Sequence, residues 1–286
     1  MKYRVEKECT ITEFLLEKQY KKNTIKNLLK FENILINNEI QTHYAFALKK
    51  DDIVEVGKKR EETPLPILYE DEDIIVVNKP CGLLTEATAN EKEKTAFFLM
   101  KEYLKKKNEK IYLVHRLDQY TSGILMFVKN KKLYDVLTSS WNECVNERGY
   151  VAIVEGMMKN RSGTIRNYLA ESKSQEVYIS SKKDGKLAIT HYRQIMTNKK
   201  YSMLEVQLET GRKNQIRVHL SSLHHPIVGD KKYGSTTHPL KRLGLHHHCF
   251  AFVHPITKKQ YQFTCKTPNE FEELFQKKKK SSTSYK

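Results

Sequence analysis

The chain lacks the features that mark a secreted, disulfide-built or membrane-spanning protein. It has only 5 cysteines in 286 residues, and no two of them form a CxxC pair. The odd number and the scattered positions indicate neither a disulfide framework nor a zinc module, and a reducing compartment fits them. The charged start, MKYRVEKECT, has no apolar core of a signal peptide. No apolar run approaches the roughly 20 residues that span a bilayer. We therefore expect a cytoplasmic protein without membrane association.

The sequence is also short of acidic residues. It contains 34 Asp and Glu against 51 Lys and Arg, so its formal net charge is +17 and its pI is about 9.4. A field of this sign attracts polyanions such as RNA, although a lysine-rich proteome would raise the charge without any such partner. The apolar content of 39%, with 16 Tyr and 11 Phe, supports a sizeable core and argues against disorder. The length suits one large domain and one small one.

Residues 1–58 have the pattern of a compact α+β unit. Apolar residues recur at helical spacing in ITEFLLEKQY and NTIKNLLKF, and ILINNEI and LKKDDIVEV then read as strands with polar turns. Lysines crowd the end of the first helical stretch and the second one, and they include Lys22, Lys26 and Lys30. This order of elements resembles the alpha-L (S4-like) RNA-binding module of ribosomal proteins and RNA-modifying enzymes. The alternative is a generic small domain with a solvated lysine face.

The rest of the chain predicts a second, larger domain. Residues 59–66 are charged and contain proline, which is typical of a linker. Residues 67–275 mix short strand-like runs, such as IIVVNK and YVAIVEG, with a few helical stretches and no regular alternation. This favours an α+β fold with a mixed, largely antiparallel sheet over a doubly wound one. Residues 276–286 form a basic low-complexity tail that we expect to be disordered.

Candidate catalytic groups stand where strand-like runs meet polar turns. In LVHRLDQYTSGILMF, Asp118 lies between two apolar runs and just before a Thr-Ser-Gly turn. A carboxylate there can act as a base, a nucleophile or a ligand, or can simply cap the turn. Tyr150 precedes a predicted strand and by itself reads as a core or edge residue. Arg212 and Arg217 flank a predicted helix start, and arginine suits both carboxylate and phosphate partners.

Six segments in order are far more specific than any one of them. They are EDEDIIVVNKPCGLL, HRLDQYTSGILMF, GYVAIVEG, ETGRKNQIRVHL, HPIVGDKKYG and LHHHCFAFVHP. This series closely resembles the RluA/RluD-type family of RNA pseudouridine synthases, over most of residues 68–275. The resemblance implies that family's fold, a mixed, largely antiparallel sheet with helices around a central RNA-binding cleft. A preceding alpha-L module is a common arrangement in that family.

The resemblance also implies roles for particular residues. Asp118 would be the essential catalytic carboxylate, Arg217 its ion-pair partner, and Tyr150 the side chain that stacks on the target base. Arg116 would contact the RNA near the displaced uridine. Further expected RNA contacts are Arg212 in the cleft and the lysines of the first unit, Lys22, Lys26 and Lys30.

The implied reaction needs no cofactor and no metal. Isomerising uridine breaks the N1–C1′ bond, rotates the base and rebuilds the link through C5, without redox change. Asp118 could attack C1′ or remove a proton from C2′, and the sequence leaves both routes open. Either route needs an ionised carboxylate, and we expect the Arg217 guanidinium to oppose the pKa-raising effect of burial. Tyr150 or a water could help to remove the C5 proton.

Some residues depart from the family pattern, and other functions stay open. Lys213 and Asn214 replace the family's Thr-His, which leaves the local hydrogen bonding uncertain. The run HHHC at 246–249 suggests a metal site, but alternation along a strand would keep its side chains from converging. A non-catalytic RNA-binding assembly factor and a glycosidase are the rival functions, although a glycosidase usually needs two carboxylates. We expect a monomer acting on large-subunit rRNA, with tRNA as the alternative substrate.

Overall fold

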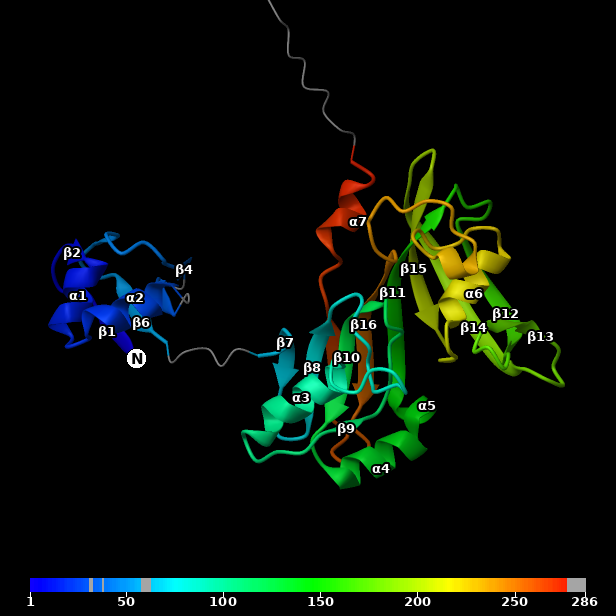
Figure 1. Ribbon diagram of the computed structural model, residues 1–286, viewed down its shortest axis with the longest axis horizontal. Coiled ribbons are helices and arrows are strands. Elements are labelled where there is room, and N and C mark those ends of the chain that lie inside the picture. The colour runs from blue at the N-terminus through cyan, green and yellow to red at the C-terminus, as the bar shows by residue number, and fades with distance from the viewer. Residues whose placement is uncertain (31–32, 38, 58–62, 277–286) are drawn as a thin grey trace, which may run out of the picture. The chain divides into compact units, whose positions relative to one another are not determined.

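The computed structural model describes residues 1–30, 33–37, 39–57 and 63–276 (Figure 1). The chain divides into two compact units, Met1–Thr63 and Pro64–Lys286. The division falls within the stretch that the sequence assigns to a linker, of which residues 59–62 lie outside the described part. The predicted tail, 276–286, also lies outside it except for Gln276. Among the described residues, no helix is long and apolar enough to cross a bilayer.

The first unit packs two short helices against short antiparallel strands. Its elements are β1 (Lys2–Arg4), β2 (Cys9–Thr10), α1 (Ile11–Glu17), α2 (Lys22–Lys30), β3 (Ile34–Ile36), β4 (Glu39–Ile40), β5 (Ala47–Leu48) and β6 (Ile53–Val56). The sheet order is β1-β6-β3-β4, and β2 pairs with β5. Thr10 begins α1 with a capping box, in which Thr10 and Glu13 each bond the other's backbone N–H. Ile11, Leu15 and Ile25 bury the apolar helix faces in one core. The polar turn expected within ILINNEI, at Asn37-Asn38, includes residue 38, which is not described.

The second unit is built on one large sheet. Its strands are β7 (Ile67–Glu70), β8 (Ile74–Lys79), β9 (Tyr112–Leu113), β10 (Ser122–Val128), β11 (Val145–Glu155), β12 (Ser162–Glu171), β13 (Val177–Ser180), β14 (Lys186–Thr197), β15 (Tyr201–Leu208), β16 (Leu245–Val253) and β17 (Gln260–Thr264). Its helices are α3 (Ala96–Lys105), α4 (Lys131–Ser139), α5 (Trp141–Cys144), α6 (Gln215–Ser222), the 3-10 turn η1 (Lys231–Tyr233) and α7 (Asn269–Glu273).

The sheet runs in the order β13-β12-β14-β15-β11-β16-β10-β8-β7, with β17 beside β16 and β9 beside β10. Strand β10 pairs with β16 in parallel, whereas the other described ladders of this sheet are antiparallel. The α+β class with a mixed, largely antiparallel sheet, predicted from the sequence, is thus confirmed. The strands near the middle of the order, β11, β16 and β10, bring segments far apart in the chain side by side (Figure 1).

Both faces of strand β10 are buried, which explains its continuous apolar sequence. Successive side chains on a strand point to opposite faces. Met126 accordingly packs in one core with Leu133 of α4. Its neighbour Leu125 packs in another core with Met100 of α3. The Thr-Ser-Gly turn that the sequence predicts is wrong in its position, because Ser122 and Gly123 already belong to β10 and the turn closes between Asp118 and Thr121. The two cores therefore anchor the strand that follows this turn.

A glycine at position 123 of β10 is required by a close approach of two strands. Gly123 has φ of +111°, a conformation that side-chain-bearing residues rarely adopt. A Cβ atom at this position would stand 2.2 Å from the carbonyl oxygen of His247 on β16. The parallel register, which sets Gly123 opposite His247, therefore depends on the missing side chain.

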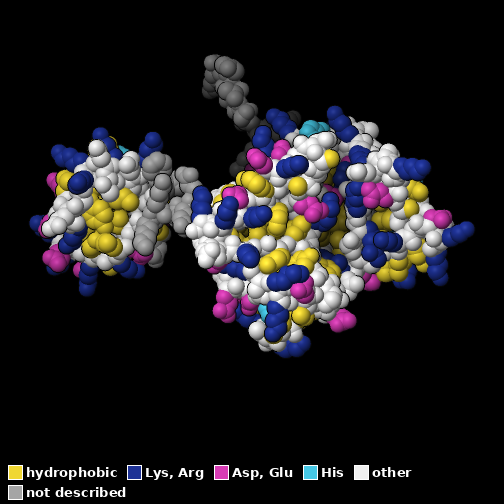
Figure 2. Space-filling view, turned by 60° about the horizontal axis from the view of Figure 1, so that its bottom comes forward, with side chains coloured by type: hydrophobic (Ala, Val, Ile, Leu, Met, Phe, Trp, Pro, Cys, Tyr) yellow, Lys and Arg dark blue, Asp and Glu magenta, His cyan; other side chains and the backbone are white. Residues whose placement is uncertain are grey.

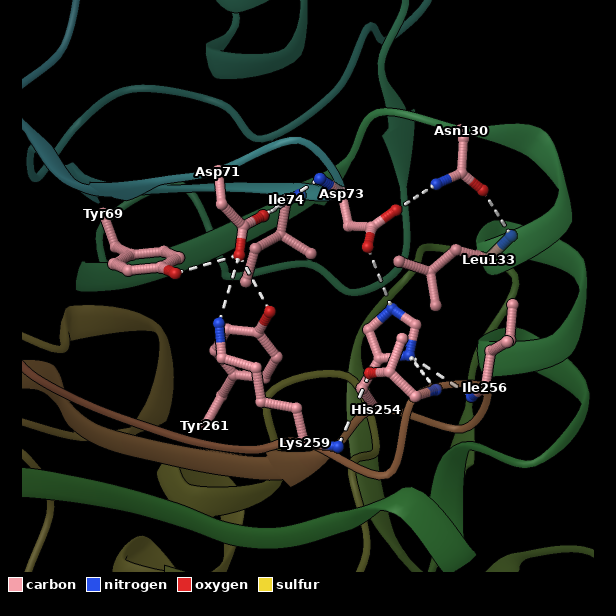
Figure 3. Close-up of polar contacts among 11 residues, drawn as sticks. Tyr69, Asp71, Asp73, Ile74, Asn130, Leu133, His254, Ile256, Lys259 and Tyr261 are labelled. Carbon is pink, nitrogen blue, oxygen red and sulfur yellow. Dashed lines mark hydrogen bonds and ion pairs between the residues drawn. The ribbon is translucent and has the colours of Figure 1, made fainter.

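A polar cluster closes the β7–β8 turn (Figure 3). The Asp71 carboxylate accepts hydrogen bonds from the hydroxyls of Tyr69 at 2.9 Å and Tyr261 at 2.8 Å. It also accepts the backbone N–H groups of Asp73 and Ile74, both at 2.9 Å. Burial raises the pKa of Asp71, but these hydrogen bonds outweigh it and hold the pKa below the ordinary 3.8. The turn is therefore fastened by a charged acceptor.

The next carboxylate, Asp73, ties the same turn to two other segments (Figure 3). It accepts from the Asn130 side chain at 2.6 Å, at the start of α4. Its other oxygen lies 3.5 Å from Nε2 of His254, which follows β16. Nδ1 of His254 accepts the backbone N–H groups of Ile256 and Thr257, so the ring proton sits on the side of Asp73.

We predict that Asp71→Asn lowers the free energy of unfolding of the second unit by roughly 1.5–3 kcal/mol at pH 7, the range for hydrogen bonds to charged groups. Because the folded pKa is the lowered one, this contribution is present above the unfolded pKa and is lost as pH falls through the folded pKa. Urea denaturation at pH 7 and at acid pH, followed by the fluorescence of the only tryptophan, Trp141, checks this. Glu72→Gln, exposed in the same turn, should change stability by less than about 0.5 kcal/mol. If Asp71→Asn lowered the free energy of unfolding by the same amount at both pH values, the account would be contradicted.

Candidate active site

One cavity of the second unit gathers the cleft residues that the sequence singles out. It has a volume of about 330 Å³, and its lining includes Arg116, Asp118, Tyr150, Arg212 and Arg217. They come from the loop before β10, from β11, from the segment that joins β15 to α6, and from α6 itself, which carries Arg217. Figure 2 shows a hollow in the face of this unit, with Lys and Arg side chains distributed around it. The lysines Lys22, Lys26 and Lys30 are exposed along α2 in the first unit.

The Asp118 carboxylate is free of the turn that follows it. Thr121 N–H donates to the backbone oxygen of Asp118 at 3.1 Å, so the turn closes through the main chain. The carboxylate lies 3.6 Å from Nη1 of Arg217 and keeps 25% of its side-chain surface exposed. The turn-capping alternative is therefore not what the structure has, and the acid faces the cavity beside a guanidinium.

Residues on both sides of Asp118 are anchored to the stretch after β8. The Lys79 ammonium is fully buried and donates to the carbonyl oxygens of Gln119 at 3.0 Å, Leu83 at 2.7 Å and Pro80 at 3.0 Å. Burial lowers its pKa to about 8.

The hydroxyl of Thr85 donates to the backbone oxygen of Leu117 at 2.7 Å and accepts its N–H at 3.2 Å. Sequence reasoning missed both Lys79 and Thr85. Only the NKPCGLL segment, quoted for its resemblance, pointed to this region.

Arg217 stands between two carboxylates. Its Nε and Nη2 donate to the two oxygens of Asp230 at 2.7 and 2.8 Å, a bidentate pair. Its Nη1 donates to the Asn214 side-chain oxygen at 2.8 Å and lies 3.6 Å from Asp118. The guanidinium carbon is 4.9 Å from the centre of the Tyr233 ring. The predicted Asp118–Arg217 pair is present, but Asp230 is the stronger partner, and sequence reasoning did not identify it.

The loop that carries Asp230 is itself held by a carboxylate. Glu155, at the end of β11, accepts from the Ser235 and Thr237 hydroxyls at 2.7 Å and from the Thr236 and Thr237 backbone N–H groups at 2.9 and 2.7 Å. Burial raises the pKa of Glu155, but these bonds outweigh it and lower the pKa overall. Glu155 thus fixes the segment that places Asp230 beside Arg217.

The two departures from the family pattern have definite partners. Asn214 adopts a left-handed conformation with φ of 53°, which asparagine tolerates better than most residues. Besides accepting from Arg217, it donates to the Tyr233 hydroxyl at 3.0 Å. Lys213 forms an ion pair with Glu171. Asn214 therefore completes the hydrogen bonding around Arg217.

Two opposing effects act on the ionisation of Asp118. Burial raises its pKa, whereas the charges of Arg217 and Arg116 lower it, and Asp230 adds a smaller raising effect. The result is a pKa above the ordinary 3.8. The guanidinium opposes burial, as the sequence led us to expect, but burial is the larger effect in the free protein.

Tyr150 lies within β11 rather than before its start, because the strand begins at Val145. Its ring stacks on His247 of β16, with centroids 4.4 Å apart and planes at 17°. Burial and the nearby charge of Asp118 raise the pKa of the Tyr150 phenol, which therefore keeps its proton at neutral pH. One face of the ring is supported by His247, while the side chain also lines the cavity.

The two outer arginines of the cavity are solvent-exposed. Arg116 forms an ion pair with Glu86 at 2.5 Å, and such exposed pairs contribute little to stability. Arg212 donates through Nε to the backbone oxygen of Leu187 at 3.0 Å. Both side chains can therefore redirect toward an anionic ligand at low cost.

The histidines of β16 do not converge. Nδ1 of His246 bonds the Ser122 hydroxyl, Nδ1 of His247 bonds the Ile124 carbonyl, and Nδ1 of His248 bonds the Cys265 carbonyl. Within the described ranges, no group of three or more His, Cys, Asp or Glu residues could hold a metal ion.

Comparison with known proteins agrees with this geometry. The sequence pattern of the RNA pseudouridylate synthase family matches residues 73–222. The chain is 32% identical to an uncharacterized RNA pseudouridine synthase, YhcT, of Bacillus subtilis, over 82% of each chain. It is 35% identical to the ribosomal large subunit pseudouridine synthase D of Zymomonas mobilis, over 75% of this chain and 73% of that one.

The fold is also that of a solved structure, human RNA pseudouridylate synthase domain containing 1. The TM-score is 0.61 at 23% identity, over 72% of this chain and 84% of that one. Sequence and fold lead to the same assignment. The chain belongs to the RNA pseudouridylate synthase family and is an isomerase that converts uridine in RNA to pseudouridine.

Proposed function

We propose that this isomerase modifies large-subunit ribosomal RNA and that Asp118 is its reacting carboxylate. The substrate class is supported by two relatives named ribosomal large subunit pseudouridine synthase D, from Zymomonas mobilis at 35% identity and from Borreliella burgdorferi at 31%. The single observation that carries the catalytic assignment is the ion pair of Asp118 with the doubly held Arg217, inside a cavity open to a ligand.

The chemistry starts from an ionised Asp118. Attack on C1′ of the ribose and removal of its C2′ proton are the two available routes, and both use the carboxylate form. In this proposal Arg217 stabilises that form and orients the carboxylate. Asp230 and Asn214 act as positioning residues, because their side-chain oxygens hold the guanidinium that faces Asp118.

Tyr150 stacks on the displaced uracil. Taking a base out of its stack costs a few kcal/mol, and stacking on an aromatic ring returns roughly 1–3 kcal/mol. The support of His247 behind Tyr150 keeps the ring in one orientation. Because the phenol stays protonated, we assign Tyr150 to stacking and not to removal of the C5 proton as a phenolate.

The cationic side chains supply the sequence-independent part of RNA binding. Arg116 and Arg212 contact the phosphates or bases beside the target uridine, with Arg116 leaving Glu86 when RNA arrives. In the first unit, Lys22, Lys26 and Lys30 recur every fourth residue along α2 and so form one charged line. We propose that this unit is an alpha-L (S4-like) module that holds structured RNA through that line.

Loss of the gene should remove pseudouridine from defined positions of large-subunit rRNA, as measured by pseudouridine mapping of total RNA. Complementation with Asp118→Asn should fail to restore the mark, with activity reduced by roughly 10²–10⁴-fold or more because the reacting carboxylate is gone. Asp184→Asn, which alters an exposed carboxylate in the β13–β14 turn, should restore it fully. Marks lost from tRNA alone would refute the rRNA assignment, and activity retained by Asp118→Asn would refute the catalytic one.

The pH dependence of the reaction should report the charge of Arg217. In the double variant Arg217→Gln/Asp230→Asn, the buried Asp230 is not left as an unpaired charge, and the larger, pKa-lowering effect of Arg217 on Asp118 is lost. The pKa of Asp118 then rises, so the acid limb of the kcat/KM profile moves to higher pH. Asp230→Asn alone removes a pKa-raising charge, so its acid limb should not move upward. Tritium release from RNA carrying uridine tritiated at C5 measures kcat/KM against pH for each protein. Acid limbs at the same pH in the wild type and the double variant would contradict the proposal.

Binding through α2 should depend on salt. Lys22→Gln/Lys26→Gln should weaken RNA binding and reduce the slope of log K against log salt by roughly 1.4–1.8, because each lost phosphate contact removes about 0.7–0.9. Lys101→Gln/Lys105→Gln, an exposed pair at the same spacing on α3, is the matched control and should leave the slope unchanged. Equal slopes for all three proteins in filter-binding titrations would rule out α2 as an RNA contact.

A further inference from the structure

A second cavity adjoins the one that holds Asp118. It has a volume of about 380 Å³ and shares Arg116, Tyr150, Leu208, Gly211 and Arg212 with the first. Its size is within the range of sites for small ligands. Tyr150 lines both cavities, so a chain that places one base against Tyr150 in the first can reach the second with an adjacent nucleotide.

An aromatic wall lines this second cavity. His115 lies against Phe250 with ring centroids 5.3 Å apart and planes at 15°, and against Trp141 at 5.6 Å and 32°. Phe250 is fully buried, whereas His115 and Trp141 are partly exposed. The His115 and Trp141 rings therefore expose flat aromatic surface to the cavity, and the buried Phe250 ring packs behind them. Such surfaces stack nucleobases with little dependence on base identity.

The charges of the cavity favour a polyanion. Arg148 lines it and donates through Nη2 to the backbone oxygen of Glu209 at 2.5 Å. Arg212 also lines it, with its Nε on the Leu187 carbonyl. In the part of the chain that the structure describes, neither arginine is paired with a carboxylate. Two guanidinium groups beside an aromatic wall match a phosphate and a base on the same strand.

Two histidines contribute unused polar atoms. Nε2 of His115 accepts the backbone N–H of Met126 at 3.0 Å, so its proton lies on Nδ1, for which the described residues provide no acceptor. His247 donates through Nδ1 to the Ile124 carbonyl at 2.7 Å, and its Nε2 is buried without a partner. Burial lowers the pKa of His115 to about 4 and that of His247 to about 3, so both rings are neutral at pH 7. Of these atoms only Nδ1 of His115, on the partly exposed ring, faces a ligand, so the lining offers one hydrogen-bond donor to the edge of a nucleobase.

We propose that the second cavity binds the nucleobase of a nucleotide next to the target uridine, stacked on the Trp141 and His115 wall with its phosphate near Arg148 and Arg212. The inference rests on the proposed function and adds to it a site that recognises a nucleotide next to the target uridine. Trp141 is the only tryptophan of the chain, so it reports directly on this contact.

The first arm of the test measures binding without turnover. The protein is full-length Asp118→Asn, and the probe is a synthetic RNA stem-loop around the mapped uridine. Intact RNA should quench the Trp141 fluorescence. Replacing one neighbouring nucleotide by an abasic ribose should abolish the quenching and weaken binding by roughly 5- to 150-fold, the ratio that one base–aromatic stack supplies. The same replacement several nucleotides away is the control and should have no effect.

The second arm measures kcat/KM by tritium release in wild type, Trp141→Ala and Trp141→Phe. The abasic neighbour should penalise wild type and Trp141→Phe, which keeps an aromatic ring, but should not penalise Trp141→Ala further, because the two changes remove the same contact. Each protein is compared with itself on two RNAs. A smaller folded fraction of Trp141→Ala would lower both values of kcat/KM equally and would leave their ratio unchanged.

The outcomes separate this inference from the function on which it rests. If the wild type forms pseudouridine but no neighbouring abasic site alters quenching or kcat/KM, the subsite is refuted and the proposed function stands. If the penalty persists undiminished in Trp141→Ala, the neighbouring base binds elsewhere and the subsite is again refuted. If the wild type forms no pseudouridine in any RNA, the proposed function fails first.

Discussion

The ionisation of one carboxylate is the constraint on which the rest of this site depends. In the proposed mechanism, Asp118 must carry a negative charge in a partly closed cavity, where burial raises its pKa. Arg217, 3.6 Å away, opposes that effect, and it can do so only because Asp230 and Asn214 hold it at 2.7–2.8 Å. A buried guanidinium with a single distant partner would be costly. The second carboxylate therefore stabilises the arginine, and the arginine stabilises the ionised form of Asp118, which is the reactive form in the proposed mechanism.

The large sheet brings these groups together from distant parts of the chain. Strand β10 begins just after the Asp118 loop, β11 carries Tyr150, and α6 follows β15 with Arg217. Two buried anchors set the geometry more finely. Lys79 binds the carbonyl oxygen of Gln119 next to Asp118, and Glu155 holds the loop that contains Asp230. The polar groups of the site are thus fixed by charged side chains that are themselves saturated with hydrogen bonds, as the cost of burying an unpaired charge requires.

Much of this arrangement could be predicted from the sequence, and the remainder could not, for physical reasons. The α+β class follows from short apolar runs without regular helix–strand alternation, and the five cleft residues stand in recognisable local motifs. Asp230 lies in the quoted segment HPIVGDKKYG, but nothing in that segment indicates its partner, which depends on how the loop folds back onto β11. In the sequence, His247 is noticeable only as part of the HHHC run, whose alternation along a strand argues against a metal site. Its stacking on Tyr150 depends on the register between β11 and β16, which no local pattern specifies. Lys79 ends the strand-like run IIVVNK, and nothing in that run indicates that three carbonyl oxygens converge on its buried ammonium.

The central claim concerns the charge of Asp118, and titration of its carboxyl carbon by NMR tests it most directly. Protein labelled with carbon-13 at the aspartate carboxyl carbons would be titrated as wild type and as Arg217→Gln/Asp230→Asn, with the Asp118→Asn spectrum identifying the resonance. The account predicts a lower pKa for Asp118 in the wild type than in the double variant. An equal or higher pKa in the wild type would show that the guanidinium does not stabilise the carboxylate, and would contradict the account.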